Sequence, residues 1–287
     1  MKTAISATKT LTHHTREGLA TQMTLYGADR FGFQPCVVYL HGFKGFKDWG
    51  FVPYTGQYFA ERGICFLAVN FSHNGISPTD PMELSDMAKF RKNTLMREVD
   101  EALEFVQFAV KGSGSMPGNN QPVGILGHSR GGGIALIAGA KTDQARAVVT
   151  WAAISNVDRF DKKTRSLWRK QGFIEVQNSR TGQMMPIDSV FLEEIDKFGR
   201  TRLNILESVK ALKKPVLFIH GRKDPTVPFY EAETLHIYGD PDLTRLRLIP
   251  GADHTFGVKH PFEESTPAFD GVLKETFEFF LEHLKKE

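Results

Sequence analysis

A serine stands at the corner of a predicted strand-to-helix turn near the middle of this chain. The apolar run 123–126 breaks into Gly127-His128-Ser129-Arg130-Gly131 and resumes at Ile134 with an apolar helical pattern. A Gly-x-Ser-x-Gly sequence between a strand and a helix is typical of a nucleophile elbow, in which the serine hydroxyl projects clear of the sheet. The glycines leave room for the tight turn, because a side chain at either position would press against it. The sequence therefore predicts nucleophilic chemistry at Ser129.

Two later stretches place an acid and a histidine after the ends of predicted strands. A serine hydroxyl is a weak nucleophile near neutral pH, so Ser129 needs a general base, and the base needs an orienting carboxylate. The predicted strand 215–219 runs into a turn that contains Asp224, and the predicted strand 246–249 runs into a turn that ends at His254. The order serine, acid, histidine is the one expected for a nucleophile elbow on a sheet of alternating strands and helices. The order predicts that Asp224 and His254 are the partners of Ser129.

Each of these residues also has a purely structural interpretation. Ser129 can be a turn serine at the start of a helix, and Asp224 can cap the helix that follows it. Asp253 is adjacent to His254 and is expected to point away from it. The other residues considered are Asp240 and Asp242, which lie in a turn before the last strand, and His41, His128 and His220, which we interpret as structural histidines that make hydrogen bonds around the strand ends.

The segments around these residues alternate between strand and helix. The first thirty residues alternate polar and apolar side chains, which predicts one or two antiparallel edge strands. Apolar runs predict buried strands at 37–40, 64–71, 123–126, 147–154 and 215–219, and a further strand is predicted at 246–249. Helices are predicted at 51–62, from 80 onward, from 134 onward, at 205–212, at 228–238 and at 266–286, with a glycine- and serine-rich connector at 111–120. This alternation is typical of an α/β fold with a mostly parallel sheet and helices on both faces.

The alternation stops at residues 155–204. We interpret this stretch as a cap insertion in a catalytic domain formed by residues 1–154 and 205–287. Within the insertion, the sequence predicts a hairpin over 173–187. Its aromatic side chains either pack in a core or line an acyl or aryl pocket.

Three side chains are candidate substrate contacts. Trp168 and Phe191 lie in the insertion, and His73 lies in a loop expected at the edge of the pocket. The insertion also carries a run of basic residues, namely Arg159, Lys162, Lys163, Arg165, Arg169 and Lys170. The run is either a solvated helix face or a means of attracting an anionic substrate, and both interpretations stay open.

Composition limits the classes of partner. The chain has 36 Lys and Arg against 33 Asp and Glu, so its net charge of +3 gives no surface basic enough to predict nucleic-acid binding. No stretch approaches the length of a transmembrane helix, and residues 1–19 lack the apolar core of a signal peptide, so we expect no membrane partner. Cys36 and Cys65 each lie in an apolar run and are interpreted as reduced core thiols, which favours a cytoplasmic protein. The sequence gives no oligomeric state.

No cofactor motif is present in the sequence. There is no His-Glu-x-x-His pair for zinc, and His13-His14 is an isolated doublet in a polar segment. No phosphate-binding loop occurs, and the glycines at 112 and 114 are followed by Pro117 where a helix should begin, which argues against a dinucleotide site. We therefore expect neither a metal nor another cofactor.

Together, these motifs make the chain similar to the α/β-hydrolase superfamily, and within it to serine esterases near the dienelactone hydrolases, cinnamoyl esterases and acyl-peptidases. The resemblance covers nearly the whole chain and depends on four motifs in order: His41-Gly42, the elbow at 127–131, His220-Gly221-x-x-Asp224-x-x-Val227-Pro228, and His254 after a glycine-containing turn. It implies an α/β-hydrolase fold with a sheet of about eight strands and a small cap. It further implies that Ser129 is the nucleophile, His254 the general base and Asp224 the orienting acid. The backbone amides of Phe43 and Arg130 would form the oxyanion hole.

The resemblance implies a serine hydrolase that cleaves small-molecule carboxylic esters through an acyl-enzyme. A peptidase of the prolyl-oligopeptidase type or a thioesterase would use the same triad on another bond, and both alternatives stay open. A third alternative is a non-catalytic relative of the fold that binds a ligand without turnover. A dehalogenase or epoxide hydrolase on this scaffold would carry aspartate at the elbow, so Ser129 excludes those two classes.

Overall fold

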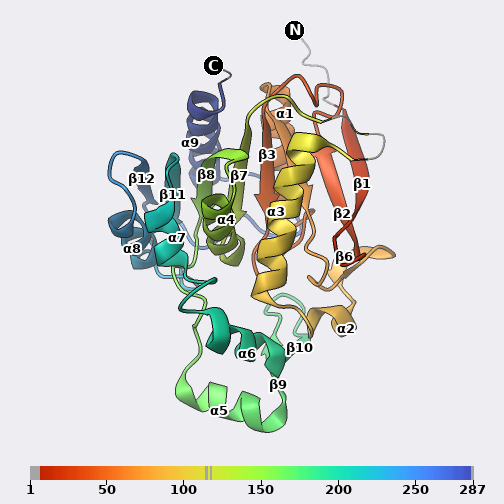
Figure 1. Cartoon of the computed structure of the whole chain (residues 1–287), viewed down its shortest axis with the longest axis vertical. Helices are drawn as coiled ribbons and strands as arrows, with labels where there is room; N and C mark the ends of the chain where they lie inside the picture. The colour runs from red at the N-terminus through yellow and green to blue at the C-terminus, as the bar shows by residue number, and fades with distance from the viewer. Residues whose placement is uncertain (1–6, 114–115, 117, 286–287) are drawn as a thin grey trace.

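An eight-stranded sheet runs through the middle of the protein, whose structure is a computed structural model describing residues 7–113, 116 and 118–285 (Figure 1). The order of the strands is β1-β2-β4-β3-β7-β8-β11-β12. Their bounds are β1 (Thr8–His14), β2 (Ala20–Tyr26), β3 (Cys36–Leu40), β4 (Cys65–Val69), β7 (Val123–His128), β8 (Ala145–Trp151), β11 (Val216–Gly221) and β12 (Thr244–Ile249). The α/β class and the sheet of about eight strands expected from the sequence are confirmed.

The sheet is parallel except at its N-terminal edge. β1 pairs antiparallel with β2, and β2 pairs antiparallel with β4, whereas the other neighbouring strands pair in parallel. All five residues of β3 are buried, because parallel partners flank it and helices cover both of its faces. The carboxyl ends of β3, β7, β11 and β12 therefore meet at one edge of the sheet, where the predicted site residues leave their strands.

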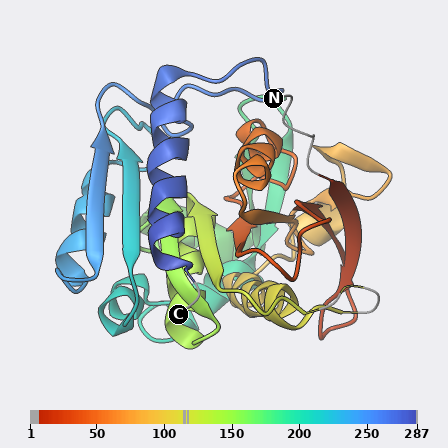
Figure 2. The ribbon, with the colours of Figure 1, turned by 90° about the horizontal axis from the view of Figure 1, so that it is seen from above.

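Helices cover both faces of the sheet, as Figure 2 shows from above. α1 (Phe51–Glu61) and α9 (Pro267–His283) pack on one face in an apolar cluster that includes Phe59 and Val272. α3 (Leu95–Lys111), α4 (Arg130–Lys141) and α7 (Ile205–Ala211) pack on the other face in a second cluster. α8 (Tyr230–Tyr238) packs beside β11 and β12. The molecule is thus a three-layer structure with one apolar core on each side of the sheet.

The segment between β4 and α3 differs from the prediction of a helix beginning at residue 80. It contains a short hairpin and one turn of helix, with the bounds β5 (Ile76–Ser77), β6 (Asp80–Leu84) and α2 (Met87–Phe90). Pro81 disfavours the helical conformation for the residue before it, which explains the extended start of β6. The long helix begins only at Leu95, where the Thr94 side chain accepts a hydrogen bond from the Arg97 amide (3.4 Å).

Residues 155–204, which we name the cap segment, lie beyond the end of the sheet, at the bottom of Figure 1. Their elements are α5 (Lys162–Gln171), β9 (Phe173–Gln177), β10 (Met184–Asp188) and α6 (Ser189–Phe198). β9 and β10 form the hairpin expected from the sequence. Trp168 is fully buried and stacks on Phe191 with ring centroids 6.0 Å apart. The cap segment therefore contributes its own aromatic residues to the apolar core on the α3 side.

The C-terminal helix α9 ends at His283, before the predicted end at 286. Residue 286 lies outside the described residues, as do residues 114, 115 and 117 of the predicted connector. In the part of the chain that the structure describes, no helix is both long enough and apolar enough to cross a membrane.

Candidate active site

Ser129 connects β7 to α4 through a strained backbone. Its φ is 57° and its ψ is −121°, in the left-handed half of conformational space that non-glycine residues rarely occupy. A Cβ on Gly127 would overlap the carbonyl oxygen of Gly131, and a Cβ on Gly131 would overlap that of Leu40. Because no side chain fits at either position, both glycines are required by the turn. This is the geometry of a nucleophile elbow.

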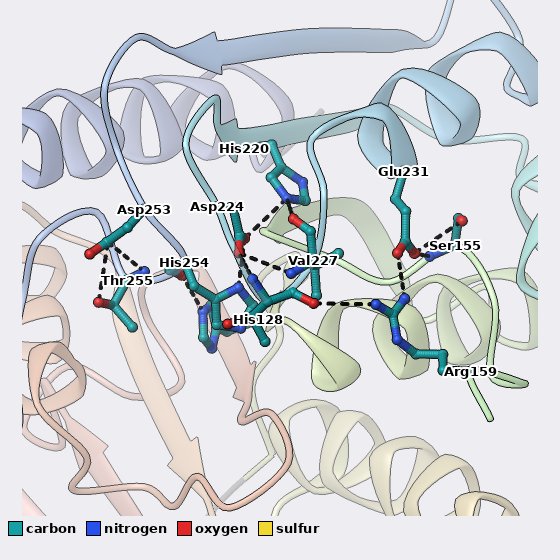
Figure 3. Close-up of polar contacts among 11 residues, drawn as sticks. His128, Ser155, Arg159, His220, Asp224, Val227, Glu231, Asp253, His254 and Thr255 are labelled. Carbon is teal, nitrogen blue, oxygen red and sulfur yellow. Dashed lines mark hydrogen bonds and ion pairs between the residues drawn. The ribbon is translucent and has the colours of Figure 1, made fainter. Parts of the chain in front are cut away.

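The turns after β11 and β12 bring Asp224 and His254 into contact (Figure 3). Nδ1 of His254 lies 2.6 Å from Oδ2 of Asp224. The other carboxylate oxygen accepts hydrogen bonds from the backbone amides of Thr226 (2.8 Å) and Val227 (2.9 Å). The Nε2 atom of His220 lies 3.2 Å from Oδ2 and 2.8 Å from the carbonyl oxygen of Val227. The side chain of Asp224 is fully buried, so these contacts replace water around it.

The contacts around Asp224 keep its carboxyl group ionised. Burial alone would raise the pKa of this group, but hydrogen bonds from His220, His254 and Val227 outweigh burial and hold the pKa well below its usual range. A carboxylate at this position favours the His254 tautomer that carries its proton on Nδ1. The Nε2 atom of His254 is then free to accept a proton.

His128, the residue before Ser129, holds the backbone of His254. Its Nε2 atom lies 2.9 Å from the carbonyl oxygen of His254, and the two rings lie 4.8 Å apart. Because the partner is a carbonyl, Nε2 of His128 is the donor. Burial lowers the pKa of His128 to about 3, so the ring is neutral near pH 7. The sequence interpretation of His128 as structural missed this contact with the candidate base.

The loop after β3 touches Ser129 directly. A Cβ on Gly42 would lie 2.9 Å from the Cβ of Ser129, closer than side-chain atoms tolerate. The Gly45 amide donates a hydrogen bond to the Gly42 carbonyl (3.0 Å), which closes a turn with Phe43 and Lys44 at its centre. Lys44 has a φ of 61°, at a turn position where glycine is usual. The Phe43 amide, predicted as an oxyanion donor, thus belongs to a loop packed against the serine.

The His41 ring fixes this loop to the end of β4. Its Nε2 atom accepts a hydrogen bond from the Phe71 amide (3.2 Å), and its Nδ1 atom lies 2.9 Å from the Gly42 carbonyl oxygen. Burial lowers the pKa of His41 to about 4, which keeps the ring neutral and able to accept. These contacts agree with the interpretation of His41 as a structural histidine.

The side chain of Arg130 joins the elbow to the cap segment. Its Nη2 atom lies 2.6 Å from Oε1 of Glu98 on α3. The guanidinium carbon lies 4.6 Å from the ring centroid of Phe43 and 5.8 Å from that of Phe191 on α6. Cations are attracted to aromatic faces at such distances. The elbow, α3, the Phe43 loop and α6 therefore meet at one guanidinium group.

A pocket of about 520 Å³ is lined by both Ser129 and His254. We define the pocket floor as Gly42, His128, Ser129 and His254, with Asp224 behind His254, and the pocket rim as Lys44, Asn178, Ser179, Arg180 and Lys259. Aromatic rings, including those of Phe46 and Trp49, complete the wall. Among the described residues, the Ser129 hydroxyl makes no hydrogen bond to His254, and no group of three or more His, Cys, Asp or Glu side chains is arranged to hold a metal ion. Catalytic hydrogen bonds are often long in a free enzyme and shorten on substrate binding.

The pocket rim comes partly from the cap segment. Residues 178–180 lie in the turn between β9 and β10, and the Lys44 ammonium donates a hydrogen bond to the carbonyl oxygen of Gln177 (3.1 Å). Arg180 forms a two-bond ion pair with Glu83 of β6 (2.8 and 3.1 Å). No sequence motif predicts the rim residues, and only Lys44, beside the predicted oxyanion residue Phe43, is adjacent to one.

The three side chains expected to contact substrate do not line this pocket. His73 is buried and its Nδ1 atom lies 2.9 Å from the Ser72 hydroxyl. Trp168 and Phe191 stack on each other inside the cap segment. Their apolar surface is already covered by protein, so the expectation of substrate contact is not met at these three positions.

The three arginines of the basic run in the cap segment form ion pairs with acids. Arg159 pairs with Glu231 of α8, as Figure 3 shows. Arg165 pairs with Asp158 and Asp196, and Arg169 also pairs with Asp196, at 2.6 Å. None of the six basic residues of the run lines the pocket. The run therefore makes no direct contact with the space that a substrate would occupy in the pocket.

The sheet, the strained serine after β7 and the acid–histidine pair after β11 and β12 define an α/β hydrolase of the serine type. The sequence pattern of the prolyl oligopeptidase family matches residues 49–287. The chain therefore belongs to the prolyl oligopeptidase family. The matched range contains Ser129, Asp224 and His254.

Individual relatives agree with this class. The chain is 28% identical over 156 residues to the serine hydrolase BPHL of Mus musculus, covering 48% of this chain and 50% of that protein, so it spans about half the length of that relative. It is 24% identical over 227 residues to YitV of Bacillus subtilis (strain 168), named as a candidate esterase, covering 77% of this chain and 82% of that protein. The structure of Est1E from Butyrivibrio proteoclasticus with bound ferulic acid has a TM-score of 0.73 and 19% identity, over 96% of this chain and 100% of that chain. At such identity, the structural likeness shows the fold.

Proposed function

We propose that this serine hydrolase cleaves carboxylic esters of small molecules, with Ser129, His254 and Asp224 as its catalytic triad. The observation that carries the proposal is the hydrogen bond between Asp224 and His254 (2.6 Å) behind a pocket that His254 shares with the strained Ser129. A strained serine beside an oriented imidazole is the arrangement that acyl transfer requires.

The mechanism follows from the tautomer of His254 that its hydrogen bond to Asp224 favours. His254, with its proton on Nδ1 held by Asp224, uses Nε2 to take the proton of the Ser129 hydroxyl as the oxygen attacks the ester carbonyl. The negative charge that develops on the carbonyl oxygen is stabilised by the backbone amides of Phe43 and Arg130. His254 then returns the proton to the leaving alcohol, and water releases the acid by the same steps.

Replacement of the nucleophile tests the proposal. We expect Ser129→Ala to lower kcat for 4-nitrophenyl esters by about 10⁶, as in serine proteases that lose the nucleophile, and to abolish labelling by a fluorophosphonate probe. Ser179 also lines the pocket, so Ser179→Ala is a matched control that should keep both labelling and turnover. Unchanged hydrolysis and labelling in Ser129→Ala would refute the proposal.

A second candidate function is cleavage of peptide bonds, which the family membership favours. The same triad and oxyanion donors would serve it, because both reactions pass through an acyl-enzyme. A panel of 4-nitrophenyl esters, hydroxycinnamate esters, peptide anilides and acyl thioesters separates the candidates by kcat/KM. Labelling of the native protein by the probe would also argue against the alternative of a ligand-binding protein without turnover.

Two further proposals concern the cap segment and the cellular location. We propose that residues 155–204 act as the cap of the pocket, since the β9–β10 turn supplies three of its lining residues. We also propose a cytoplasmic location. Its support is that Cys36 and Cys65 are buried free thiols although they are register partners on adjacent strands.

A further inference from the structure

The charged side chains that line the pocket are all cationic. The side chains that line it include Lys44, Arg180 and Lys259, and none of its lining residues is an aspartate or a glutamate. Arg180 is already neutralised by its ion pair with Glu83. The Lys259 ammonium nitrogen lies 3.7 Å from a carboxylate oxygen of Glu263, and both side chains are exposed. Exposed ion pairs of this kind contribute little interaction energy. Excess positive charge therefore remains at the rim, mainly on Lys44 and Lys259.

Lys44 stands out among these cations. Among the described residues, no carboxylate lies within 4 Å of its ammonium group, which donates a hydrogen bond to the Gln177 carbonyl oxygen (3.1 Å) and lies 5.5 Å from the ring centroid of Phe43. Burial lowers the pKa of this half-buried group, which means that its charged form is poorly hydrated. An ammonium has three donors, so at least one remains available to a ligand.

The backbone of Lys44 adds a second observation. A φ of 61° disfavours any residue with a side chain, and glycine would fit this turn position without strain. The chain nevertheless has lysine there, one residue from the Phe43 amide that we assign to the oxyanion hole. Strained residues persist where the surrounding structure holds them, and they cluster at functional sites.

We propose that the preferred substrate is an ester that carries a second, negatively charged group, a carboxylate, and that Lys44 binds this carboxylate while Ser129 attacks the ester carbonyl. The inference rests on the proposed ester hydrolysis and adds the class of substrate. A singly charged carboxylate matches the single unpaired ammonium beside the serine, and Lys259 provides a further positive charge at the rim.

Matched ester pairs test the inference. On the acyl side, 4-nitrophenyl hydrogen adipate is compared with 4-nitrophenyl hexanoate, and on the alcohol side, 4-carboxyphenyl butyrate is compared with 4-carbamoylphenyl butyrate. The measured quantity is the ratio of kcat/KM for the anionic ester to that for its neutral partner. We expect a ratio of about ten or more in at least one pair, because a hydrogen bond to a charged group typically strengthens binding about tenfold or more. The ratio should fall as salt is added.

Substitutions assign the preference to Lys44. Lys44→Met should lower the ratio about tenfold, whereas Lys44→Arg should retain most of it. Lys163→Met is the control, because it removes the same charge from an exposed position of the cap segment that does not line the pocket. A ratio near one in both pairs, or a preference that survives Lys44→Met, would overturn the inference.

Inhibition of the unmodified enzyme gives a test that does not depend on variants. Adipate monoamide, an anion, should inhibit hydrolysis of 4-nitrophenyl butyrate about tenfold more strongly than the neutral diamide of adipic acid. Equal inhibition overturns the inference. If neutral esters are hydrolysed through Ser129 without any preference for anions, the inference fails while the proposed function stands. If no ester is hydrolysed through Ser129, the proposed function fails and the inference fails with it.

Discussion

The floor and the rim of the pocket are built in different ways. The floor residues are held by glycines that tolerate no side chain, by buried hydrogen bonds and by the ends of parallel strands. The rim residues come from the Phe43 loop, the β9–β10 turn and the loop before α9. The charged rim side chains contact a backbone carbonyl or form surface ion pairs, and Asn178 makes hydrogen bonds within its own turn. Buried polar contacts fix geometry strongly, whereas exposed ion pairs contribute little.

This difference suggests that the floor and the rim have separate tasks, the reaction for the floor and the choice of substrate for the rim. Under the proposed function, the floor determines which bond is attacked and how, because small displacements there alter the alignment of reacting atoms. The rim would then determine which molecule reaches the floor. Substitutions in the floor should therefore lower kcat, and substitutions in the rim should change KM or substrate preference.

The largest effect after loss of Ser129 itself is expected at Asp224. Asp224→Asn should lower kcat by about 10⁴, because an amide favours the wrong tautomer of His254 and does not stabilise the imidazolium. Asp253→Asn is the matched control, since Asp253 is adjacent to His254 but accepts hydrogen bonds from the amides of Thr255 (3.0 Å) and Gly257 (2.8 Å). Steady-state kinetics on one ester check both variants, and a similar loss in the two would contradict the assignment of Asp224.

The next largest effect is expected at Gly42. The added methyl of Gly42→Ala would lie 2.9 Å from the Cβ of Ser129, so the loop that presents the Phe43 amide must shift. We expect kcat to fall by about 10², as for the loss or displacement of one oxyanion donor. Gly271→Ala is the control, because a Cβ at that position in α9 meets no atom within 4 Å, and it should leave kcat unchanged. A normal kcat in Gly42→Ala would show that the loop does not serve the reaction.

A smaller effect is expected at His128. His128→Phe keeps a ring but removes the donor to the His254 carbonyl oxygen, which leaves a buried acceptor without a partner. We expect kcat to fall about tenfold with KM unchanged, and His128→Gln, which retains a donor, to recover part of the loss. A change in KM alone would mean that His128 contacts substrate instead of positioning His254.

The smallest effect is expected at the rim. Arg180→Gln breaks the ion pair with Glu83 that holds the β9–β10 turn, and we expect KM to rise by about threefold with little change in kcat. Arg169→Gln removes a comparable ion pair with Asp196 that lies away from the pocket and should change neither constant. If Arg180→Gln instead lowers kcat tenfold or more, the division between floor and rim is wrong.

Much of the floor was predictable from the sequence. The elbow is a local feature, because its strained turn excludes side chains from Gly127 and Gly131 and leaves a recognisable pattern. Asp224 follows a strand with an evident apolar run, and His254 follows a strand in which Leu246 and Leu248 alternate with arginines. Parallel strands place their carboxyl ends together. The mostly parallel sheet and its helices followed from the same runs.

The rim and the cap contacts were not predictable for a physical reason. Arg180 reaches the pocket only because a whole hairpin lies beyond the end of the sheet, and its turn has no composition that signals a place in the pocket wall. Trp168 and Phe191 are aromatic, as pocket-lining residues often are, but their rings stack on each other inside the cap segment. Arg159 and Arg169 of the basic run likewise pair with acids on α8 and α6, at sequence distances that no local pattern encodes. The early helix prediction failed at residue 80 because Pro81 and the Thr94 cap override the apolar periodicity.

The guanidinium of Arg130 has a consequence for how substrate arrives. It pairs with Glu98 and contacts the rings of Phe43 and Phe191. An outward movement of α6 would therefore remove the cation-π contact between Arg130 and Phe191. The same movement would disturb the loop that carries the Phe43 amide. We therefore expect the cap segment to behave as a fixed wall and not as a lid, with substrate diffusing in through an opening that is always present. In such an enzyme no gating step precedes the chemistry, and turnover is limited by acylation, deacylation or product release.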